Sequence, residues 1–327
     1  MYKNSDYWDA EDICFEYEHI EKVLEVIKAN FDDYFERFIL SNAGNTLTEE
    51  DFKKLQQKFG IGAVKNNTTK NKAQNYKSII IDAIEAFEKD REDYKKIFDI
   101  DLLEELEDDA DVFKSKILKN ECPVIRKTLA NRRAKELDKY RASFNMADAD
   151  ELLSVITNLC KFADEYYSRY DADLYENFNI YDDLEMFTLD TDDYTYYGVI
   201  GGGIKTHMLF KIYPAVFSNR SRSALWALWY LTDKKTFDCE TDSEFVMIDT
   251  EKAIMQQNYF YPYGLFSYYA LEIYKLLREK ANDYGVFIDP EYKYVIVDAF
   301  LEYVALEHDE EISFLKSQIR DGGMGFA

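Results

Sequence analysis

The sequence predicts a predominantly all-α protein, in which an antiparallel helical bundle is followed by a smaller, aromatic-rich and mainly helical domain with at most a short hairpin. Three observations support this fold class. Between Ala63 and Tyr197 there is no glycine and one proline, Pro123, so tight strand turns are hard to build there. Apolar residues recur at helical spacing along most of that stretch. Aromatic residues make up 16% of the 327 residues, enough for a core rich in rings.

The clearest predicted element is a long helix at residues 13–38, where apolar residues step alternately by four and three positions. Aromatic residues in this series favour an antiparallel bundle over a regular coiled coil. A short helix from Thr48 to Phe59 follows, opened by a capping box of Thr48 and Asp51, and then a polar loop at residues 60–75. The stepping residues are Ile13, Tyr17, Ile20, Leu24, Ile27, Phe31, Tyr34 and Phe38.

Four further helices complete the first predicted domain, residues 1–187. The apolar pattern places them at residues 76–98, at 102–118, after Pro123 as far as Tyr140, and from Asp148 to Tyr166.

The second predicted domain, residues 188–327, begins near the point where glycine reappears in the sequence and the helical pattern of apolar residues ends. Residues 194–213 contain a glycine triplet between two partly apolar runs, which predicts a small hairpin or an irregular loop. Ser221 is expected to cap a helix through Leu231. Pro262 and Asp289-Pro290 are expected to open the two remaining helices.

Charge is distributed in alternating blocks along the chain. The net charge is −10 over residues 1–51, +7 over 52–81, −10 over 82–113, +7 over 114–144, −12 over 145–197, +5 over 198–235 and −11 over 236–327, for a total of −24. Such segregation shapes the surface field and the choice of partners without naming a reaction. The net charge of −24 argues against simple wrapping of nucleic acid, unless the basic residues gather on one face.

The cysteines and the N-terminal residues predict a cytoplasmic protein. The N-terminal residues have no basic and apolar regions of the secretory kind, and the longest apolar run, Ala224–Leu231, is too short for a membrane span. The four cysteines are far apart, without a CxxC pair, so we expect free thiols in a reducing compartment and no metal or other cofactor.

The basic, glycine-rich segment 198–235 holds the densest group of candidate binding residues. Exposed N–H groups of a glycine turn beside cations suit a phosphate or carboxylate, as does the start of a helix near Arg222. The spacing is not that of a P-loop. Structural pairing of these cations with acidic neighbours is the alternative. The candidate anion-binding residues are Lys205, His207, Lys211, Arg220 and Arg222.

A second basic patch follows Pro123. It is either a contact surface for phosphate groups or a solvated helix face that pairs with the preceding acidic block. Its candidate residues are Arg126, Lys127, Arg132 and Arg133.

No catalytic pattern is recognisable. The acids at 238–251 lack the spacing of a metal-dependent nuclease, since Glu251 and Lys252 are adjacent. His19 is expected to be structural and His308 to lie on the surface among acids. No nucleophile elbow is present.

The sequence therefore favours a non-enzymatic interaction or regulatory subunit of a bacterium or phage, with a protein partner and with a nucleic-acid-handling machine as one candidate. Contact with nucleic acid through the basic segments is a further candidate interaction, and no contact with a membrane is expected. Two alternatives stay open: an acidic mimic that inhibits a DNA- or RNA-binding protein, and an enzyme acting on a phosphate-bearing substrate.

Overall fold

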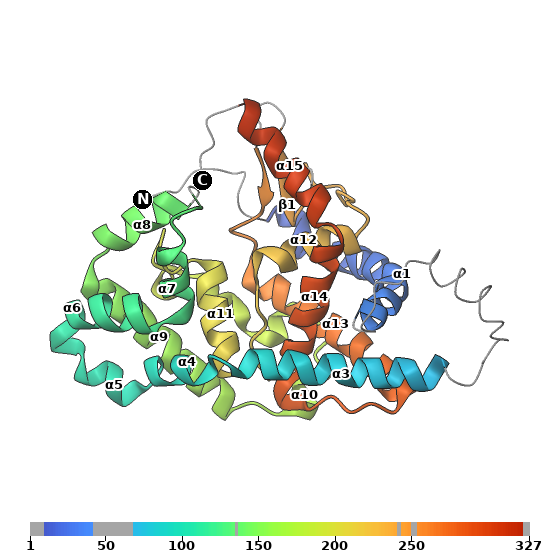
Figure 1. The fold of residues 1–327 in the computed structure, drawn as a ribbon, viewed down its shortest axis with the longest axis horizontal. Coiled ribbons are helices and arrows are strands. Elements are labelled where there is room, and N and C mark those ends of the chain that lie inside the picture. Colours follow the sequence, from blue (N-terminus) through green and yellow to red (C-terminus); the bar gives the residue numbers. More distant parts are fainter. Residues whose placement is uncertain (1–9, 42–67, 135–136, 241–242, 250–253, 323–327) are drawn as a thin grey trace, which may run out of the picture.

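Helices of very different lengths form the protein in a computed structural model that describes residues 10–41, 68–134, 137–240, 243–249 and 254–322 (Figure 1). The predicted fold class is confirmed, because the described residues are predominantly helical and their strands form one antiparallel hairpin. The elements of the first half are η1 (Asp12–Phe15), α1 (Tyr17–Ser41), α3 (Thr68–Glu88), α4 (Arg91–Ile97), α5 (Ile100–Glu105), η2 (Glu107–Asp109), α6 (Ala110–Val112), the π-helix η3 (Phe113–Glu121), α7 (Pro123–Ala130), α8 (Asp138–Met146) and α9 (Ala149–Ser168).

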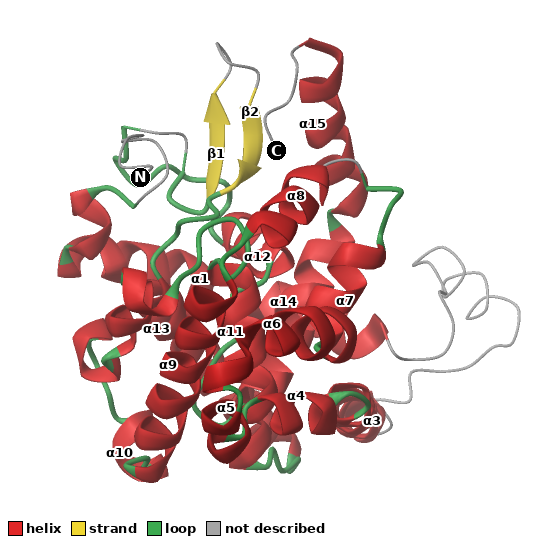
Figure 2. Ribbon diagram, turned by 90° about the vertical axis from the view of Figure 1, so that its left-hand side faces the viewer, coloured by secondary structure: helices red, strands yellow, loops and turns green. Residues whose placement is uncertain are grey.

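The second half contains shorter helical turns, the hairpin and three long helices. Figure 2 shows the hairpin and α15 projecting from the same end of the helical body. The elements are α10 (Ala172–Glu176), η5 (Tyr181–Leu184), η6 (Met186–Asp190), η7 (Asp192–Tyr194), α11 (Gly202–Ile212), α12 (Arg222–Leu231), β1 (Val246–Asp249), β2 (Ile254–Gln257), α13 (Tyr263–Tyr284), η8 (Pro290–Tyr292), α14 (Lys293–Glu307) and α15 (Asp309–Gly322).

The predicted first helix is confirmed as α1. Most residues of its apolar series are buried, as the heptad spacing requires, although Tyr17 is exposed. The predicted cap at Ser221 is also present, since its hydroxyl accepts the N–H of Ala224 in α12. The helix predicted to begin near Asp148 is α9, and the Asp148 carboxylate accepts the N–H of Glu151 at its start.

Several predicted boundaries are wrong. The helix predicted at 76–98 is interrupted between α3 and α4, and the helix predicted at 102–118 is four short pieces, α5 to η3. Residues 68–75, assigned to a polar loop, form the start of α3. The remainder of that predicted loop and the short helix predicted from Thr48 to Phe59 lie outside the described residues.

The small hairpin or irregular loop predicted within residues 194–213 is wrong for residues 202–212, and the segment before them has a single bridge between Tyr196 and Ile200. Residues 202–212 form α11, which is buried on most sides, so its sequence shows no polar face to reveal the helical period. The strands β1 and β2 lie in the acidic segment instead, with Val246 opposite Gln257.

One continuous core joins the two halves of the chain. Helices α1 and α3 contact α13 and α14, and Phe31 of α1 packs against Phe300 of α14. The division into domains at residue 187 stays a prediction, but buried side chains from both sides of it belong to one cluster. None of the described helices is long and apolar enough to cross a bilayer.

Several helix ends inside the fold are capped by side chains that are distant in sequence. Arg91 donates to the carbonyls of Lys211 and Ile212 at the end of α11, at 3.1 and 3.0 Å. Asn30 of α1 donates to the carbonyl of Leu231 at the end of α12, at 2.9 Å. Carbonyls at helix C-termini have no partner within the helix, so these bonds replace water at buried ends.

We expect Arg91→Lys to lower the free energy of unfolding by about 1–3 kcal/mol, because one ammonium group cannot replace a planar guanidinium that also pairs with Glu88. Urea unfolding followed by circular dichroism measures this. Lys95→Gln, which breaks an exposed pair with Glu92, is the matched control and should change stability by less than about 0.5 kcal/mol. Equal urea midpoints for the two variants would contradict the capping role.

Candidate functional site

The glycine triplet forms the start of α11 and packs against Arg220. Gly201 is the N-cap residue, and Gly202 and Gly203 are the first residues of the helix. A Cβ atom on Gly202 would lie 1.4 Å from Nη2 of Arg220, whereas one on Gly203 would have no atom closer than 3.8 Å. Close approach of the guanidinium therefore requires a glycine at position 202.

Arg220 is buried, with 4% of its surface exposed. Its Nη2 atom donates to the carbonyl oxygen of Tyr259 at 3.0 Å, while its Nε atom has no hydrogen-bond partner. Burial lowers the pKa of Arg220, and the nearby Asp190 carboxylate opposes that effect. Asp190 therefore compensates the charge of this arginine inside the protein.

Lys205 lies near the same carboxylate. Its ammonium group donates to the carbonyl of Leu189 and to Oγ1 of Thr195, and burial lowers its pKa to about 8. Asp190 in turn accepts the N–H of Tyr263 at 2.8 Å, at the start of α13. Burial raises the pKa of Asp190, with Lys205 and Arg220 acting in the opposite direction. One acid thus caps a helix and balances two buried cations.

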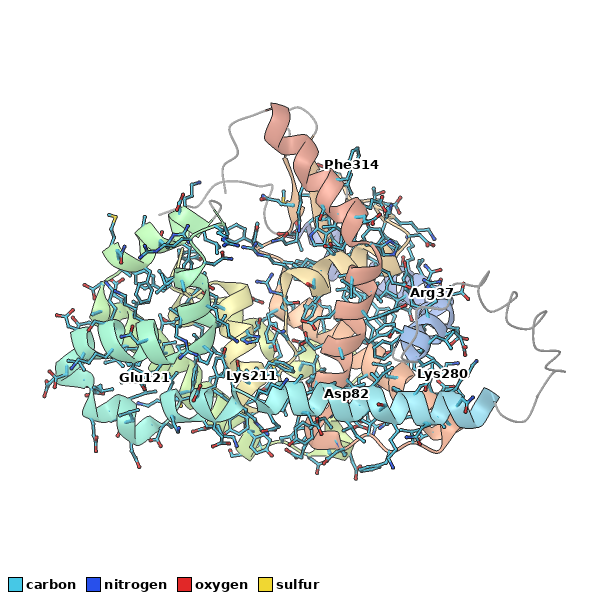
Figure 3. The ribbon with its side chains drawn as sticks, in the orientation of Figure 1. Arg37, Asp82, Glu121, Lys211, Lys280 and Phe314 are labelled. Carbon is cyan, nitrogen blue, oxygen red and sulfur yellow. The ribbon has the colours of Figure 1, made fainter. Side chains whose placement is uncertain are left out.

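Lys211 lies apart from this group, near the middle of the molecule where α3 is followed by α4 (Figure 3). It donates to the carbonyl of Phe87 at 2.7 Å and pairs with Oδ1 of Asp90 at 2.7 Å. Burial opposes ionisation of Asp90, but hydrogen bonds from Lys211 and Lys127 outweigh it, so the pKa of Asp90 is lowered. The ammonium group of Lys211 therefore has both of these partners inside the fold.

His207 belongs to a polar cluster between α11 and α14. Burial and the charge of Lys211 lower the pKa of His207 to about 4, so its ring is neutral at pH 7. Nδ2 of Asn219 donates to Oδ1 of Asp298 at 2.9 Å. Burial, and then the charge of Glu302 one turn later, raise the pKa of Asp298 to about 8, and burial also raises the pKa of Glu302.

Asp190, Asp298 and Glu302 are not among the site residues predicted from the sequence. A signal for the last two was present, since they are acids four positions apart in a helix that is otherwise largely apolar. The sequence contains no such signal for Asp190, because its partners Lys205, Arg220 and Tyr263 come at irregular separations along the chain and meet it only in the folded structure.

Arg222 differs from the other four candidates, because its side chain is exposed. Its guanidinium carbon lies 5.5 Å from the centre of the Tyr259 ring. The structure therefore brings Lys205 and Arg220 together around Asp190, places His207 and Lys211 in another cluster, and leaves Arg222 at the surface. Anion binding by the whole set stays a prediction.

The second basic patch has a different environment. Arg126 donates to the carbonyl of Asn120, and Lys127 pairs with Asp90 at 3.1 Å. Arg132 and Arg133 are exposed and form no ion pair with any described residue. The adjacent π-helix η3 contributes further exposed cations, and α7 and η3 are in contact. We call the exposed set without ion pairs to described residues the basic face: Lys116, Lys119, Arg126, Arg132 and Arg133.

Two surface hollows, each of about 500 Å³, lie away from the predicted anion site. One is lined by residues of α13, such as Lys275, and by the end of α10 and the residues after it, such as Glu176 and Asn177. The other is lined by Arg91, Asp99 and Glu291 among others. Their linings mix both signs of charge, so neither favours one kind of ligand. Comparison with known proteins adds no relative: no family model, curated protein or solved structure matches the chain.

We expect Gly202→Ala to lower the free energy of unfolding by about 1–3 kcal/mol, because the new methyl group displaces a buried guanidinium from Tyr259. Gly203→Ala is the matched control and should stabilise α11 by up to about 1 kcal/mol. Thermal and urea unfolding measure both variants. A Gly202→Ala protein as stable as the Gly203→Ala protein would show that Arg220 moves aside at little cost.

We expect Asp298→Asn to stabilise the protein at pH 8 and to do so less as the pH falls. The pKa of Asp298 is raised in the folded state, so the wild type loses stability as the pH rises from about 4, the usual pKa of an aspartate, towards 8. The amide introduced by Asp298→Asn carries no charge at any pH, so the variant avoids this loss. Scanning calorimetry of both proteins from pH 4 to 8 measures this. At pH 8 the melting temperature of Asp298→Asn should be about 2–4 °C higher than that of the wild type. Asp33→Asn, at an exposed position of α1, controls for net charge. A gain that is the same at every pH would refute the buried-acid interpretation.

Proposed function

We propose that this protein is a non-enzymatic interaction subunit that docks the basic face onto an acidic surface of a partner protein. The single observation that supports this is the different use of the two basic segments. Lys205, Lys211 and Arg220 bond groups inside the fold, whereas the basic face is exposed and forms no ion pair with described residues. In a chain with a net charge of −24, cations left exposed without a counter-charge favour contact with an anionic partner.

The surroundings of the basic face fit a protein partner. Lys114 of η3 donates to the carbonyls of Asn145 and Ala147, which places Met146 next to this helix. The side chain of Met146 is 86% exposed. Arginine and methionine are enriched in protein interfaces, and an apolar group beside cations offers both burial and charge pairing. The same arginines count against an acidic mimic of nucleic acid, because a mimic profits from one sign of charge.

The large excess of acids favours a protein over nucleic acid. The molecule has 64 acidic and 40 basic residues, so a long nucleic acid that reaches past the basic face would meet acidic surface. At low salt these acids would repel its phosphate groups. A folded partner with a local acidic patch avoids that repulsion. We place this interaction in the cytoplasm, in keeping with four cysteines that are all free thiols.

We expect Arg132→Gln/Arg133→Gln to weaken partner binding by roughly 2- to 30-fold, because two exposed charge contacts of about 0.2–1 kcal/mol each are lost. The measurement is affinity capture from an extract of the source organism at 50 and 200 mM salt, followed by titration with the captured protein. Lys77→Gln/Lys89→Gln makes the same charge change at exposed positions of α3 and its end, and should bind as the wild type does.

Three outcomes would count against the proposal. Capture of no stoichiometric protein at low salt would remove the partner. Equal binding by both double variants would remove the basic face as the contact. Loss of the captured material after nuclease treatment would make nucleic acid the ligand instead.

A further inference from the structure

Three side chains of metal-binding type meet in the core although they are far apart in sequence. Cys14 belongs to η1, His19 to the first turn of α1, and Cys239 to the segment between α12 and β1. The two sulfur atoms and a ring nitrogen of His19 all lie within 4.8 Å of one another. The distance between the sulfurs is 3.7 Å.

Most of this cluster is buried, although Cys239 is partly exposed, and one nitrogen atom of the cluster has no hydrogen bond. Cys14 is fully buried, and His19 is 2% exposed. Nε2 of His19 bonds Oε2 of Glu244 at 2.8 Å, but Nδ1 has no partner. Glu244 also accepts from the hydroxyl of Tyr261 at 3.3 Å. A buried histidine held by a buried carboxylate is the arrangement that orients imidazole ligands in metal sites.

The distance between the sulfurs matches a shared cation better than a covalent bond. In a tetrahedral zinc site with Zn–S bonds of about 2.3 Å, two sulfur ligands lie about 3.8 Å apart. A disulfide would require about 2.05 Å. Two thiolates and an imidazole are also the donor set that zinc prefers, and the two thiolates balance the charge of Zn²⁺.

We propose that Cys14, His19 and Cys239 bind Zn²⁺, with Glu244 orienting His19. The site is structural, because it joins the beginning of α1 to a segment 225 residues later in the chain. Each ligand comes from a different local element, so the cation binds the folded chain and not the unfolded one. Binding of this kind adds to folding stability.

The segment that carries Cys239 has a reason to need such a link. Asp233, Lys234, Phe237 and Asp238 all have positive φ angles, between 52° and 67°. Residues other than glycine rarely adopt this conformation, and they keep it only where the surrounding structure enforces it. The Phe237 ring packs against His19, with 5.9 Å between the ring centres. A zinc ion bound two residues later would hold this segment against α1.

The test is titration of the reduced, chelator-treated full chain with Zn²⁺ alone, in competition with a chromophoric chelator. We expect one equivalent to bind with a dissociation constant below about 1 μM. Co²⁺ in place of Zn²⁺ should give thiolate-to-cobalt charge-transfer absorption and the intense visible bands of a tetrahedral site. The melting temperature should rise with Zn²⁺ and fall again with chelator.

Variants assign the site to these residues. Cys14→Ser/Cys239→Ser should weaken Zn²⁺ binding at least 100-fold and abolish the charge-transfer absorption, while Cys122→Ser/Cys160→Ser, at the other two buried cysteines, should leave both unchanged. Glu244→Gln should weaken binding by about 10- to 100-fold. Circular dichroism checks that each variant is folded, and the cobalt spectrum of the wild type tests the proposal even where a variant does not fold.

Three results would overturn the proposal. One is a reduced, folded wild type that takes up no equivalent of Zn²⁺. Another is binding that survives in a folded Cys14→Ser/Cys239→Ser protein. The third is protein isolated with two thiols fewer and a mass lower by two hydrogens, which would show that the two sulfurs form a disulfide.

Discussion

The fold depends on giving partners to backbone groups at helix ends that are buried inside the molecule. Asp190 accepts the N–H of Tyr263 at the start of α13, and Arg91 donates to the last carbonyls of α11. Lys211 donates to the carbonyl of Phe87 near the end of α3. A buried carbonyl or N–H without a partner costs free energy comparable to a lost hydrogen bond, so short helices can meet inside the core only where such side chains reach them.

This requirement explains why so many charged residues are inside a protein with a large net charge. Each buried cation needs a counter-charge as well as an acceptor, and Asp190 and Asp90 supply it for Lys205, Arg220 and Lys211. The raised pKa of Asp190 and the lowered pKa of Lys205 both follow from burial. The charge blocks of the sequence are therefore partly matched inside the fold, and the basic face is one part that has no ion pair among the described residues.

Patterns of neighbouring residues in the sequence predicted the features of the fold that depend on neighbouring residues. The apolar series of α1, the cap at Ser221, and the helix starts near Asp148 and at Asp289-Pro290 depend on residues at most four positions apart, and the structure confirms them. Helix α11 was missed because a helix buried on most sides has no polar face. The groups around Asp190 and His19 were missed because their members are joined by tertiary contacts alone, and neither spacing nor composition encodes these.

The contrast between the buried cations and the cysteine–histidine cluster separates structural polarity from a binding site. Lys205 and Lys211 donate to carbonyls, and Arg220 does too, so their burial has a structural reason. Cys14 and Cys239 bond no carbonyl in the described residues, and Nδ1 of His19 bonds nothing. The two sulfur atoms lie 3.7 Å apart, near a carboxylate that bonds His19, and Cys239 follows four residues with left-handed backbone. These sulfur atoms cap no helix and balance no cation of the described residues. A bound cation gives the two sulfur atoms and Nδ1 of His19 a common partner, which is the physical reason for bringing them together.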